Sequence, residues 1–541
     1  MLMKQVFTNT LFMLCFVTAA FAQDNTMSLN GGCGTKDFDL IRDRLFENRY
    51  ELEKGITAEE RGATRYIPIK FHLIAKADKT GRVSEQKVLE NLCQMNIDYA
   101  DQGVVFYLSG GTFSYIDNDA MYSDPGKTAQ LMQNKRDGKA INVFVALNAT
   151  NEGGSTPLGG TTLAYYSPTR DWLVSRKDQL NATSGTLSHE FGHYFSLLHP
   201  HHGWDQENLI QKYNFASWGA VPDYFKIPDT VAPDGSTPIE CFNGSNCKVA
   251  GDYVCDTYAD YNFGFGWAGC TEFNKRLISP CDKDTINLKK FDETLFMGYF
   301  IGCKDYVFTT EQKNLMLKDY NSSKRAYIKS AFVPTVAVQN TSKLVYPYSS
   351  NNATPISISP FDAIEFTWEA VANASNYIVE IDRTSSFSTV ELQRFLLPGS
   401  ATKQLVKNLK ANLTYYWRVY PYSDGGLCID PAQVSKVYTV FKTTATSATK
   451  ELTDISSVTI APNPVSENSA LTMTVFAEKA TIANITMIDV AGKVIKNFGV
   501  QNLTIGQNDI SLDLNNTTKG VYFIRLNIDG ANISRKVVVA E

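Results

Sequence analysis

The stretch that decides the fold lies in the middle of the chain and holds five of its six histidines. It reads His189-Glu190-Phe191-Gly192-His193-Tyr194-Phe195-Ser196-Leu197-Leu198-His199-Pro200-His201-His202. On a helix of about 3.6 residues per turn, the spacing of His189 and His193 places both imidazoles on one face. Two neutral imidazoles build a poor core but hold Zn²⁺ well. The stretch therefore predicts a helix that carries a zinc site.

A third histidine and a glutamate extend this site. His199 lies too far along to share the face of a continuous helix, so it completes a three-histidine site only if the chain turns back. Three neutral histidines leave zinc one open position, where a bound water has a pKa of about 7. Glu190 can accept the proton of that water and return it to a leaving amine. The pattern predicts a zinc peptidase with Glu190 as general base.

The other histidines are not predicted to bind the metal. His201 and His202 are expected in a loop, and His72, which alternates with apolar neighbours, on the surface of a strand. Glu207 is the alternative third ligand, but His199 is better placed. A helix whose histidines only face solvent is the alternative to a zinc site and has little to support it.

Length and composition bound the architecture. Single cores rarely grow past about 250–300 residues, so a chain of 541 residues should hold several domains. The formal net charge of −5 is small for this length and points to neither nucleic acid nor an anionic membrane. Residues 1–22, with Lys4 before an apolar run and Ala20-Phe21-Ala22 at the end, predict a secretory signal. No later segment has the ~20 apolar residues of a membrane span. We expect an exported, soluble protein without a transmembrane segment.

The cysteines agree with export. Cys15 leaves with the signal, and six of the others cluster at Cys241, Cys247, Cys255, Cys270, Cys281 and Cys303. In an oxidising compartment this even number predicts three disulfides, although the spacing leaves their pairing open. A second metal site is the alternative, but the cluster contains no Cys-x-x-Cys pair. Cys33, Cys93 and Cys428 lie outside it, and Cys93 is expected to be a core thiol.

Helix and strand signals divide the chain into domains. Residues 66–73 alternate like a strand, residues 84–101 form an amphipathic helix, and a cysteine-rich, loop-rich half runs on to a closing helix at 308–320. After Pro334 short alternating strands replace this pattern, as is typical of all-β sandwiches. The predicted fold class is therefore multidomain. Residues 63–332 are expected to form an α/β (α+β) catalytic domain with a cleft. Residues 336–445 and 456–541 are expected to form two all-β sandwich-like domains, joined by a linker at 443–449.

Residues 189–199 resemble the zinc motif of the metzincin clan of metallopeptidases, His-Glu-x-x-His-x-x-Gly-x-x-His. Ser196 stands where the family has glycine, which tolerates the positive φ of the bend after the helix. Serine is expected to make that bend costlier. Leu295-Phe296-Met297-Gly298-Tyr299 resembles the methionine turn of the clan. The resemblance implies that Met297 lies beneath the zinc and that Tyr299 lies near it and stabilises the oxyanion.

Within the clan, residues 30–325 resemble the pappalysins, through motifs in the same order at 251–257, 269–270, the methionine turn, Cys303 and 308–312. The resemblance implies the bridges Cys270–Cys303, Cys247–Cys281 and Cys241–Cys255. It also implies Ca²⁺ near Asp252 and Thr257, which offer hard oxygen ligands. Family members that cleave at Arg or Lys carry an acid just before the cysteine matched to Cys303. Ile301 and Gly302 stand there in this chain, so an apolar preference is equally open.

Gly32-Cys33-Gly34-Thr35 resembles the Cys-Gly motif of pappalysin propeptides. The resemblance implies that residues 23–62 are a propeptide in which the Cys33 thiolate fills the fourth zinc position of a latent zymogen. Arg61 and Arg65 are candidate activation points. An incidental N-terminal thiol is the alternative.

The C-terminal third carries two further resemblances. Residues 336–445 resemble a fibronectin type III module, through Trp368, Tyr377 and Tyr416-Trp417-Arg418-Val419. Residues 456–541 resemble the C-terminal sorting domain of the type IX secretion system, through Ala461-Pro462-Asn463-Pro464, Gly492-Lys493, Gly520-Val521-Tyr522 and Arg535-Lys536-Val537-Val538-Val539. This second resemblance implies contact with the secretion machinery, export through the outer membrane, and a secreted or cell-surface location.

The sequence thus predicts a secreted zinc metalloendopeptidase that acts on extracellular proteins or peptides and is made as a latent zymogen. An alternative of another class is a non-catalytic surface adhesin whose zinc site is structural and whose sandwich binds a ligand. Structural zinc sites are usually closed by four protein ligands, so three histidines beside Glu190 favour catalysis. A zinc amidase that acts on a non-protein amide is a further alternative.

Overall fold

The computed structural model describes residues 31–57, 62–152, 161–267, 276–281, 285–286, 293–359, 361–429, 438–444, 455–467, 469–528 and 531–540. The predicted signal at 1–22, Arg61, Cys270 and residues 445–449 of the predicted linker lie outside these residues. The chain divides into two compact units. Unit 1 takes in the described residues up to Asn340 together with Val371–Asn376 and Pro421–Val434, and unit 2 takes in Thr341–Ala370, Tyr377–Tyr420 and the rest of the chain from Ser435.

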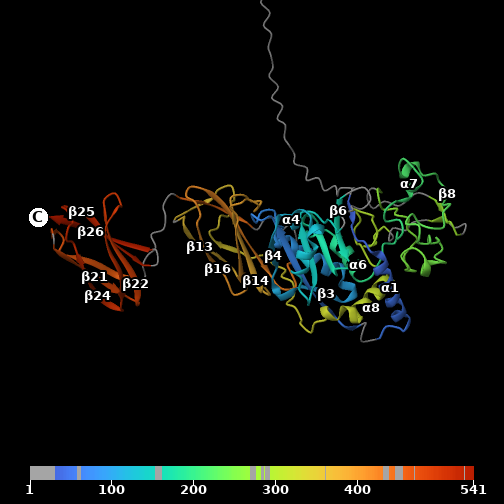
Figure 1. Cartoon of the computed structure of the whole chain (residues 1–541), viewed down its shortest axis with the longest axis horizontal. Helices are drawn as coiled ribbons and strands as arrows, with labels where there is room; N and C mark the ends of the chain where they lie inside the picture. Colours follow the sequence, from blue (N-terminus) through green and yellow to red (C-terminus); the bar gives the residue numbers. More distant parts are fainter. Residues whose placement is uncertain are drawn as a thin grey trace, which may run out of the picture. The chain divides into compact units, whose positions relative to one another are not determined.

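A mixed sheet forms the core of unit 1 (Figure 1). Its strand order is β1-β6-β7-β5-β2-β3, and β4 also pairs with β2. Its strands are β1 (Gly31–Cys33), β2 (Arg65–Ala75), β3 (Val104–Leu108), β4 (Ser114–Asp117), β5 (Ile141–Ala146), β6 (Thr161–Ser167) and β7 (Trp172–Arg176). The pairs β2–β3, β2–β4, β2–β5 and β5–β7 are parallel, whereas β6 runs antiparallel to β7. Every residue of β5 is buried, as expected of a central strand covered on both faces.

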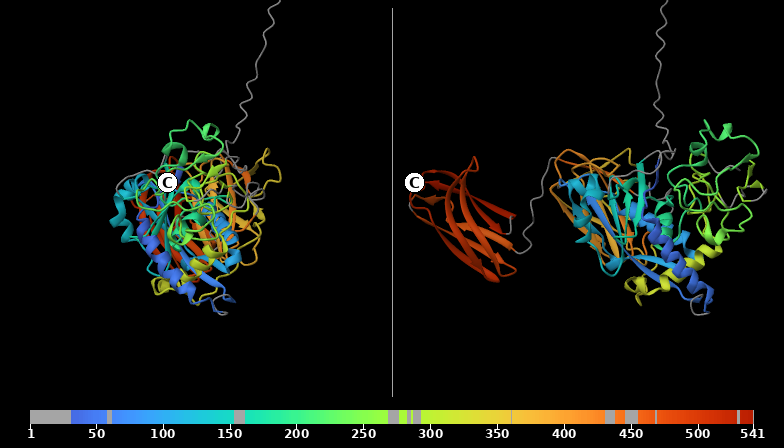
Figure 2. Two further views of the ribbon diagram at one scale, coloured as in Figure 1. Left: turned by 90° about the vertical axis from the view of Figure 1, so that its right-hand side faces the viewer. Right: turned by 45° about the vertical axis from the view of Figure 1, so that its right-hand side comes forward.

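Helices cover this sheet and carry the site. The longer ones are α1 (Phe38–Glu53), α3 (Glu85–Asp98), α6 (Thr186–Tyr194) and α8 (Thr310–Asn321), and the short ones are α4 (Asp119–Ser123) and α5 (Ala129–Gln133). The short α7 (Leu209–Lys212) lies instead in the irregular chain after α6. The hydroxyl of Tyr99, which follows α3, donates to the carbonyl of Ser188 on α6 at 2.8 Å and so holds the site helix. Helices α1 and α8 lie side by side (Figure 2). The predicted helices at 84–101 and at 308–320 are present within a few residues.

Irregular chain follows α6, as the sequence predicted. Its described strands are the short β8 (Phe225–Lys226), β9 (Leu277–Ile278) and β10 (Thr285–Ile286). A separate apolar cluster that includes Trp204, Trp218 and Tyr261 holds this half together.

The disulfides differ from the implied pairing. Cys241 pairs with Cys281, and Cys247 pairs with Cys255, so the bridges Cys247–Cys281 and Cys241–Cys255 were wrong. A third bridge, Cys93–Cys428, joins α3 to the segment Pro421–Val434 of unit 1, so Cys93 is not a free core thiol. Cys303 is also disulfide-bonded, and the implied bridge to Cys270 stays a prediction because Cys270 lies outside the described residues. Among the described cysteines, Cys33 alone is free.

His72 also differs from its prediction. It lies on β2, is 1% exposed, stacks on Phe144 with ring centroids 4.3 Å apart, and donates from Nε2 to Asn142 Oδ1 at 3.0 Å. The alternation that suggested a surface position reflects two buried faces, because β2 lies inside the sheet. Burial lowers the pKa of His72 to about 4.

The middle domain is the predicted sandwich of two sheets. One sheet has the order β11-β13-β16 and the other β12-β18-β17-β14-β15. Their strands are β11 (Leu344–Tyr346), β12 (Ile356–Ile358), β13 (Ala363–Trp368), β14 (Asn376–Asp382), β15 (Gln393–Pro398), β16 (Lys403–Lys407), β17 (Thr414–Tyr422) and β18 (Thr439–Thr443). Trp368, Tyr377 and Trp417, on which the prediction was based, are all buried.

The C-terminal strands form two more sheets, β19-β21-β24 and β20-β26-β25-β22-β23. They are β19 (Ile455–Ala461), β20 (Val465–Ser466), β21 (Ala470–Ala477), β22 (Thr481–Asp489), β23 (Val494–Leu503), β24 (Gly506–Asp513), β25 (Gly520–Ile528) and β26 (Ala531–Ala540). Alternate residues of β21 and β25 point into a shared apolar core.

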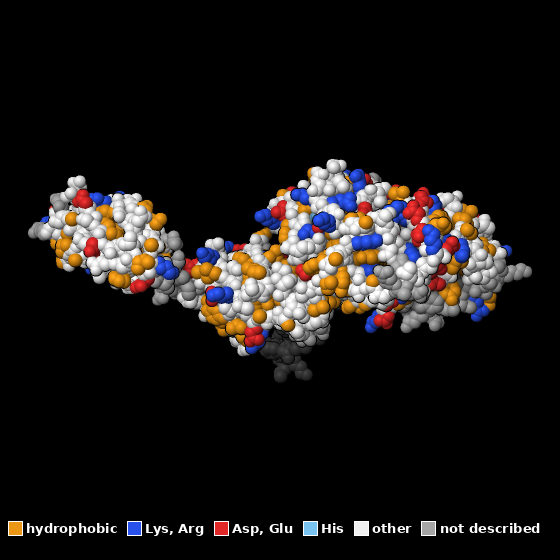
Figure 3. All heavy atoms as spheres, turned by 90° about the horizontal axis from the view of Figure 1, so that it is seen from below, with side chains coloured by type: hydrophobic (Ala, Val, Ile, Leu, Met, Phe, Trp, Pro, Cys, Tyr) orange, Lys and Arg blue, Asp and Glu red, His pale blue; other side chains and the backbone are white. Residues whose placement is uncertain are grey.

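On the face drawn in Figure 3, Lys and Arg are interspersed with Asp and Glu, in keeping with the small net charge of −5.

Candidate metal centre

Helix α6 ends in a bend that sends the chain back toward its own histidines. Ser196 has a φ of 71°, in the left-handed region. Its N–H donates to the carbonyl of His193 at 3.0 Å, and the N–H of Leu197 donates to the carbonyl of Gly192 at 2.9 Å. This pair of bonds is the Schellman motif, which usually has glycine where Ser196 stands. The expected cost of serine is real, since a left-handed non-glycine residue costs about 1–2 kcal/mol, but Asn48 Nδ2 donates to its Oγ at 2.7 Å.

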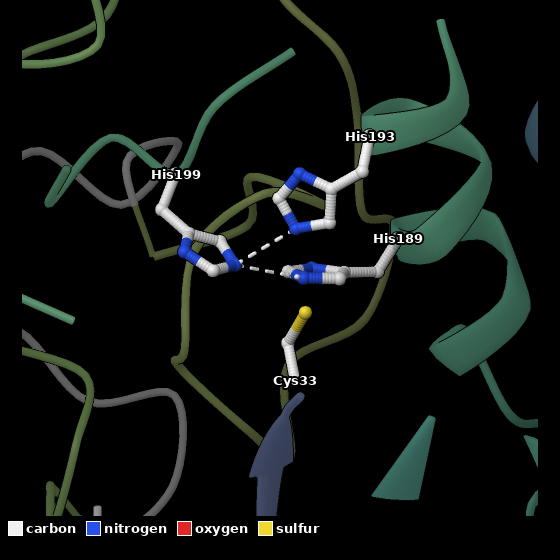
Figure 4. Close-up of side chains that lie close together, drawn as sticks. All are labelled: Cys33, His189, His193 and His199. Atoms are coloured by element: carbon white, nitrogen blue, oxygen red, sulfur yellow. Dashed lines mark hydrogen bonds between the residues drawn. The ribbon is translucent and has the colours of Figure 1, made fainter. Parts of the chain in front are cut away.

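The bend brings three imidazoles together (Figure 4). His199 Nε2 lies 3.1 Å from His189 Nε2 and 2.9 Å from His193 Nε2. The Nδ1 atoms of His189 and His193 contact the carbonyls of Phe296 and Leu197 at 2.7 and 2.8 Å. Because a carbonyl only accepts, each of these Nδ1 atoms carries the proton and each Nε2 presents a lone pair.

The Nδ1 of His199 donates to the carboxylate of Asp205, so all three Nε2 atoms present lone pairs to one another. Lone pairs about 3 Å apart repel unless a cation lies among them. With Zn–N bonds of about 2.0–2.1 Å, the nitrogens of a tetrahedral site stand about 3.3 Å apart, close to the separations here. The donor set therefore fits zinc, and sequence reasoning missed Asp205, which orients His199.

Burial keeps these ligands neutral. It lowers the pKa of His189 to about 3 and that of His199 to about 4, the latter against the opposing pull of Asp205. Burial and the neighbouring histidines hold the pKa of His193 well below its usual range. Neutral imidazole is the form that binds a metal.

Glu190 lies beside this centre and is 1% exposed. Its Oε2 accepts from the N–H of Tyr166 at 3.0 Å, from the Thr35 hydroxyl at 3.1 Å and from the Cys33 thiol at 3.4 Å. Burial raises the pKa of Glu190 to about 7, although these hydrogen bonds act to lower it. A carboxyl with this pKa can both take up and release a proton near neutral pH.

The N-terminal segment reaches into the centre. Strand β1 pairs with β6 and ends at Cys33, whose thiol points at the three imidazoles (Figure 4). The Sγ atom and one nitrogen from each of His189, His193 and His199 lie within 4.8 Å of one another. Burial and the charge of Glu190 raise the pKa of the Cys33 thiol. A cation at the centre would favour the thiolate instead.

Met297 lies against α6, and Tyr299 lies beside the histidine cluster. Met297 is fully buried against α6, since a Cβ at Gly192 would collide with its Sδ. The Tyr299 ring lies 4.9 Å from the His199 ring and 6.1 Å from the His189 ring, between centroids. Burial raises the pKa of Tyr299, so its hydroxyl stays protonated.

The remaining histidines of the cluster lie in the turn after His199, as predicted, but they are buried. His201 stacks on the His199 ring at 4.6 Å, and its nitrogens lie 3.9 Å from Asp205 Oδ1 and 3.6 Å from Asp260 Oδ2. His202 Nδ1 lies 3.6 Å from Asp205 Oδ2. Neither belongs to the group of Cys33 and three histidines that could hold a metal ion, although His201 forms a second such group with His199 and Asp205.

A second group of acids lies at the predicted calcium position. The Asp252 carboxylate accepts from Val254 N–H at 3.0 Å and from the Thr257 hydroxyl at 3.1 Å. Glu240 is 3% exposed, and neither of its carboxylate oxygens finds a hydrogen-bond partner among the described residues. Burial and the charge of Asp252 raise the pKa of Glu240 to about 9, and burial raises that of Asp252 well above its usual range. Sequence reasoning missed Glu240.

The C-terminal residues match a known domain family. Residues 459–540 match the secretion system C-terminal sorting domain. This match confirms the predicted type IX sorting tail and implies that the chain meets the secretion machinery, crosses the outer membrane, and is secreted or attached to the cell surface. Within the described part of the chain, every helix is too short or too polar for a membrane span.

The chain matches no curated protein. A mutant of Tannerella forsythia promirolysin is similar in structure at 16% identity and a TM-score of 0.34, over 55% of this chain and 96% of that chain. The FN1–FN3 domains of chicken CNTN1 are similar at 10% identity and a TM-score of 0.15, over 40% of this chain and 68% of that chain. TM-scores this low do not establish a shared fold, so the function of the N-terminal domain is inferred from its own side chains.

Proposed function

We propose that this chain is an exported zinc metalloendopeptidase of the metzincin type, made in a latent form. One observation carries the proposal. Each of the three imidazoles is protonated at its own Nδ1, and all three direct their Nε2 lone pairs at one point beside a buried carboxylate. His189, His193 and His199 would hold the zinc. Zinc bound there would supply a Lewis acid for a peptide carbonyl and would lower the pKa of water to about 7.

The protein's own groups would move the protons. Glu190 Oε2 would take a proton from the attacking water and pass it to the amine nitrogen that leaves when the peptide C–N bond breaks. A carboxyl with a pKa of about 7 suits both transfers. The protonated hydroxyl of Tyr299 would donate to the developing oxyanion. Its ring contacts with two of the proposed ligands support that role.

The N-terminal segment would keep the enzyme latent. The Cys33 thiolate would fill the position that water needs, and the Thr35 hydroxyl occupies Glu190 Oε2. Helix α1 anchors this segment, because Arg44 forms an ion pair with Asp319 of α8 and Asn48 Nδ2 donates to the same carboxylate at 3.1 Å. Cleavage between α1 and β2 would release these contacts together, whereas Arg65 itself is buried and paired at the start of β2 and is not the candidate cleavage point that the sequence suggested. Cys33→Ala should shorten the activation lag, and an unchanged lag and unchanged latency would argue against the thiol switch.

We also propose Ca²⁺ at the second acidic group. Glu240 supplies two oxygens that have no hydrogen-bond partner among the described residues, and Asp252 supplies a buried carboxylate. The Thr257 hydroxyl, which donates to the Val254 carbonyl at 3.0 Å, and that carbonyl are further oxygens nearby. Buried carboxyls are costly unless they are protonated, paired or bound to a cation. Hard oxygen ligands of this kind suit calcium.

A second candidate function has one observation in its favour. Cys33 and three histidines would make a closed four-ligand set, as in structural zinc sites. On that reading the protein is a surface adhesin and Cys33 never leaves. The two readings separate in one assay: after N-terminal cleavage, the peptidase degrades casein and a zinc chelator stops it. An adhesin leaves casein intact at full zinc occupancy.

A further inference from the structure

Helix α1 carries a polar residue in its buried stripe. The buried residues of α1 are Ile41, Leu45 and Asn48, which stand three or four apart and so share one face. A buried amide is costly unless it is hydrogen-bonded. Asn48 is 4% exposed, and its Nδ2 donates to Ser196 Oγ at 2.7 Å and to Asp319 Oδ1 at 3.1 Å. The polar residue therefore joins α1 to the bend that follows α6.

Ser196 needs such a partner. It is buried, and its φ of 71° lies in the left-handed region. Relative to glycine, any other residue disfavours that conformation by about five- to thirtyfold. A hydrogen bond of the kind that Asn48 donates favours the bend by about two- to tenfold. The bond from α1 thus offsets much of the cost of serine at the bend.

The bend places two of the three histidines. The carbonyl of Leu197, the residue after Ser196, contacts His193 Nδ1 at 2.8 Å, and His199 follows two residues later. The first residue of α1 also reaches the centre, because the Phe38 ring lies edge-on to the rings of His193 and His199, at 5.8 and 5.4 Å between centroids. One helix therefore contacts both the imidazoles and the bend that positions them.

We propose that α1 is a scaffold for the metal centre, with Asn48 as the positioning residue that holds the Ser196 bend and, through it, His199. The inference rests on the proposed function, which makes His199 a zinc ligand and α1 part of the removable segment. It adds that the latent form binds zinc more tightly than the activated form by more than the Cys33 thiol explains.

The loss on activation would be local. Arg325 pairs with Asp319 at 2.8 Å and donates to the carbonyl of Tyr194, the last residue of α6. Both contacts lie outside α1, so the end of α6 keeps them when α1 leaves. Ser196, in contrast, loses the bond from Asn48. The metal-free bend can then relax, and zinc has to re-form it on binding, which lowers the apparent affinity.

A double-mutant cycle between Asn48→Ala and Ser196→Gly tests the inference in the full chain. Hydrogen exchange of metal-free protein is followed in a peptide that spans residues 191–198. We expect Asn48→Ala to speed its exchange by about two- to tenfold and to weaken zinc binding by a similar factor. With Ser196→Gly in place, Asn48→Ala should change neither quantity, because glycine adopts the left-handed conformation without a partner.

Two further variants complete the cycle. Ile41→Val is the matched control, because it removes packing from the same buried face without touching Ser196, and it should leave exchange in the bend and zinc affinity at wild-type values. Asn48→Leu keeps the volume but cannot donate, and it serves if Asn48→Ala does not fold.

Three outcomes would overturn the inference. They are unchanged exchange in the bend of folded Asn48→Ala, an effect of Asn48→Ala that is equally large with Ser196→Gly, and zinc affinity that is the same in Asn48→Ala and wild type. Absence of zinc from every variant overturns the proposed function instead, and the exchange of the metal-free bend still decides whether Asn48 holds it.

Activation gives a separate readout. In a Cys33→Ala chain, cleavage between α1 and β2 and removal of the released fragment take away α1 without taking away a thiol ligand. Zinc affinity should fall on that cleavage, and Ser196→Gly should make the fall about two- to tenfold smaller. A fall of the same size with and without Ser196→Gly would contradict the scaffold role.

Discussion

Asp205 should set the zinc affinity of the centre, although it does not touch the proposed metal position. Its carboxylate accepts the Nδ1 proton of His199, and the Gly203 N–H donates to its Oδ2 at 3.1 Å. Burial acts to raise the pKa of Asp205, but hydrogen bonds from His199 and His202 help to hold that pKa well below its usual range, so the carboxylate is ionised. An ionised acceptor fixes the His199 tautomer and makes Nε2 a better donor to a metal.

The size of the effect follows from the hydrogen bond that each variant loses. Asp205→Asn keeps an oxygen that can accept from Nδ1 but loses the charge, so a bond worth about 1.5–3 kcal/mol falls to about 0.5–1.5 kcal/mol. The difference of about 1.4 kcal/mol predicts roughly tenfold weaker zinc binding. Asp205→Ala also leaves Nδ1–H unsatisfied in a buried site and should weaken zinc binding by about a hundredfold.

Zinc affinity is measured on activated protein equilibrated with graded zinc chelators, with bound metal counted by mass spectrometry. Asp229→Asn is the matched control, because this carboxylate accepts from the Tyr213 hydroxyl at 2.9 Å instead of from a proposed ligand. Wild-type affinity in folded Asp205→Asn and Asp205→Ala would refute the reasoning, since His199 would then need no acceptor to bind metal.

Three more predictions concern stability. The pKa of His72 is depressed to about 4, so its contribution is full above pH 6.5 and is lost as the pH falls toward 4. Between pH 7.5 and 5, the unfolding free energy of the wild-type protein should therefore fall by about 2 kcal/mol more than that of His72→Gln. Urea unfolding at both pH values measures this difference, and an equal fall in the two proteins would contradict the prediction. The double variant Cys93→Ser/Cys428→Ser should lower the unfolding free energy of unit 1 in guanidinium by roughly 2–5 kcal/mol, because the bridge spans 335 residues, and wild-type stability would count against it. Calcium at 100 times its Kd should stabilise the zinc-loaded protein by about 2.7 kcal/mol and so raise its Tm, and Glu240→Gln should abolish that rise. A wild-type Tm that calcium does not change would argue against the site.

The three-histidine cluster could be predicted from the sequence because the spacing that creates it is local. The spacing of His189 and His193 fixes a shared helix face, and only the path to His199 needed more than periodicity. Ser196 shows where that reasoning stopped: it identified the bend and its cost, but the partner Asn48 lies 148 residues earlier in the chain. Glu240 was missed for a related reason, because its value as a ligand comes from burial that the sequence does not display.

The disulfide errors share one physical cause, which is the path of irregular chain. The cysteines between 241 and 281 could pair in several ways, and only the course of the loops brings Cys241 to Cys281. Cys428 looked like part of a sandwich, but its segment belongs to unit 1, where it meets Cys93. His72 was misplaced because alternation along a strand does not show whether its second face is covered.

The central claim is that three histidines hold a zinc that works with Glu190 as the base. Its most direct test is bound zinc and peptide cleavage measured together in activated wild-type and Glu190→Gln protein. We predict about one zinc per chain in both, with turnover at least about a hundredfold lower in the variant, because a general base contributes about 10²–10⁴ in rate. A Glu190→Gln protein that binds zinc and cleaves at the wild-type rate would contradict the claim.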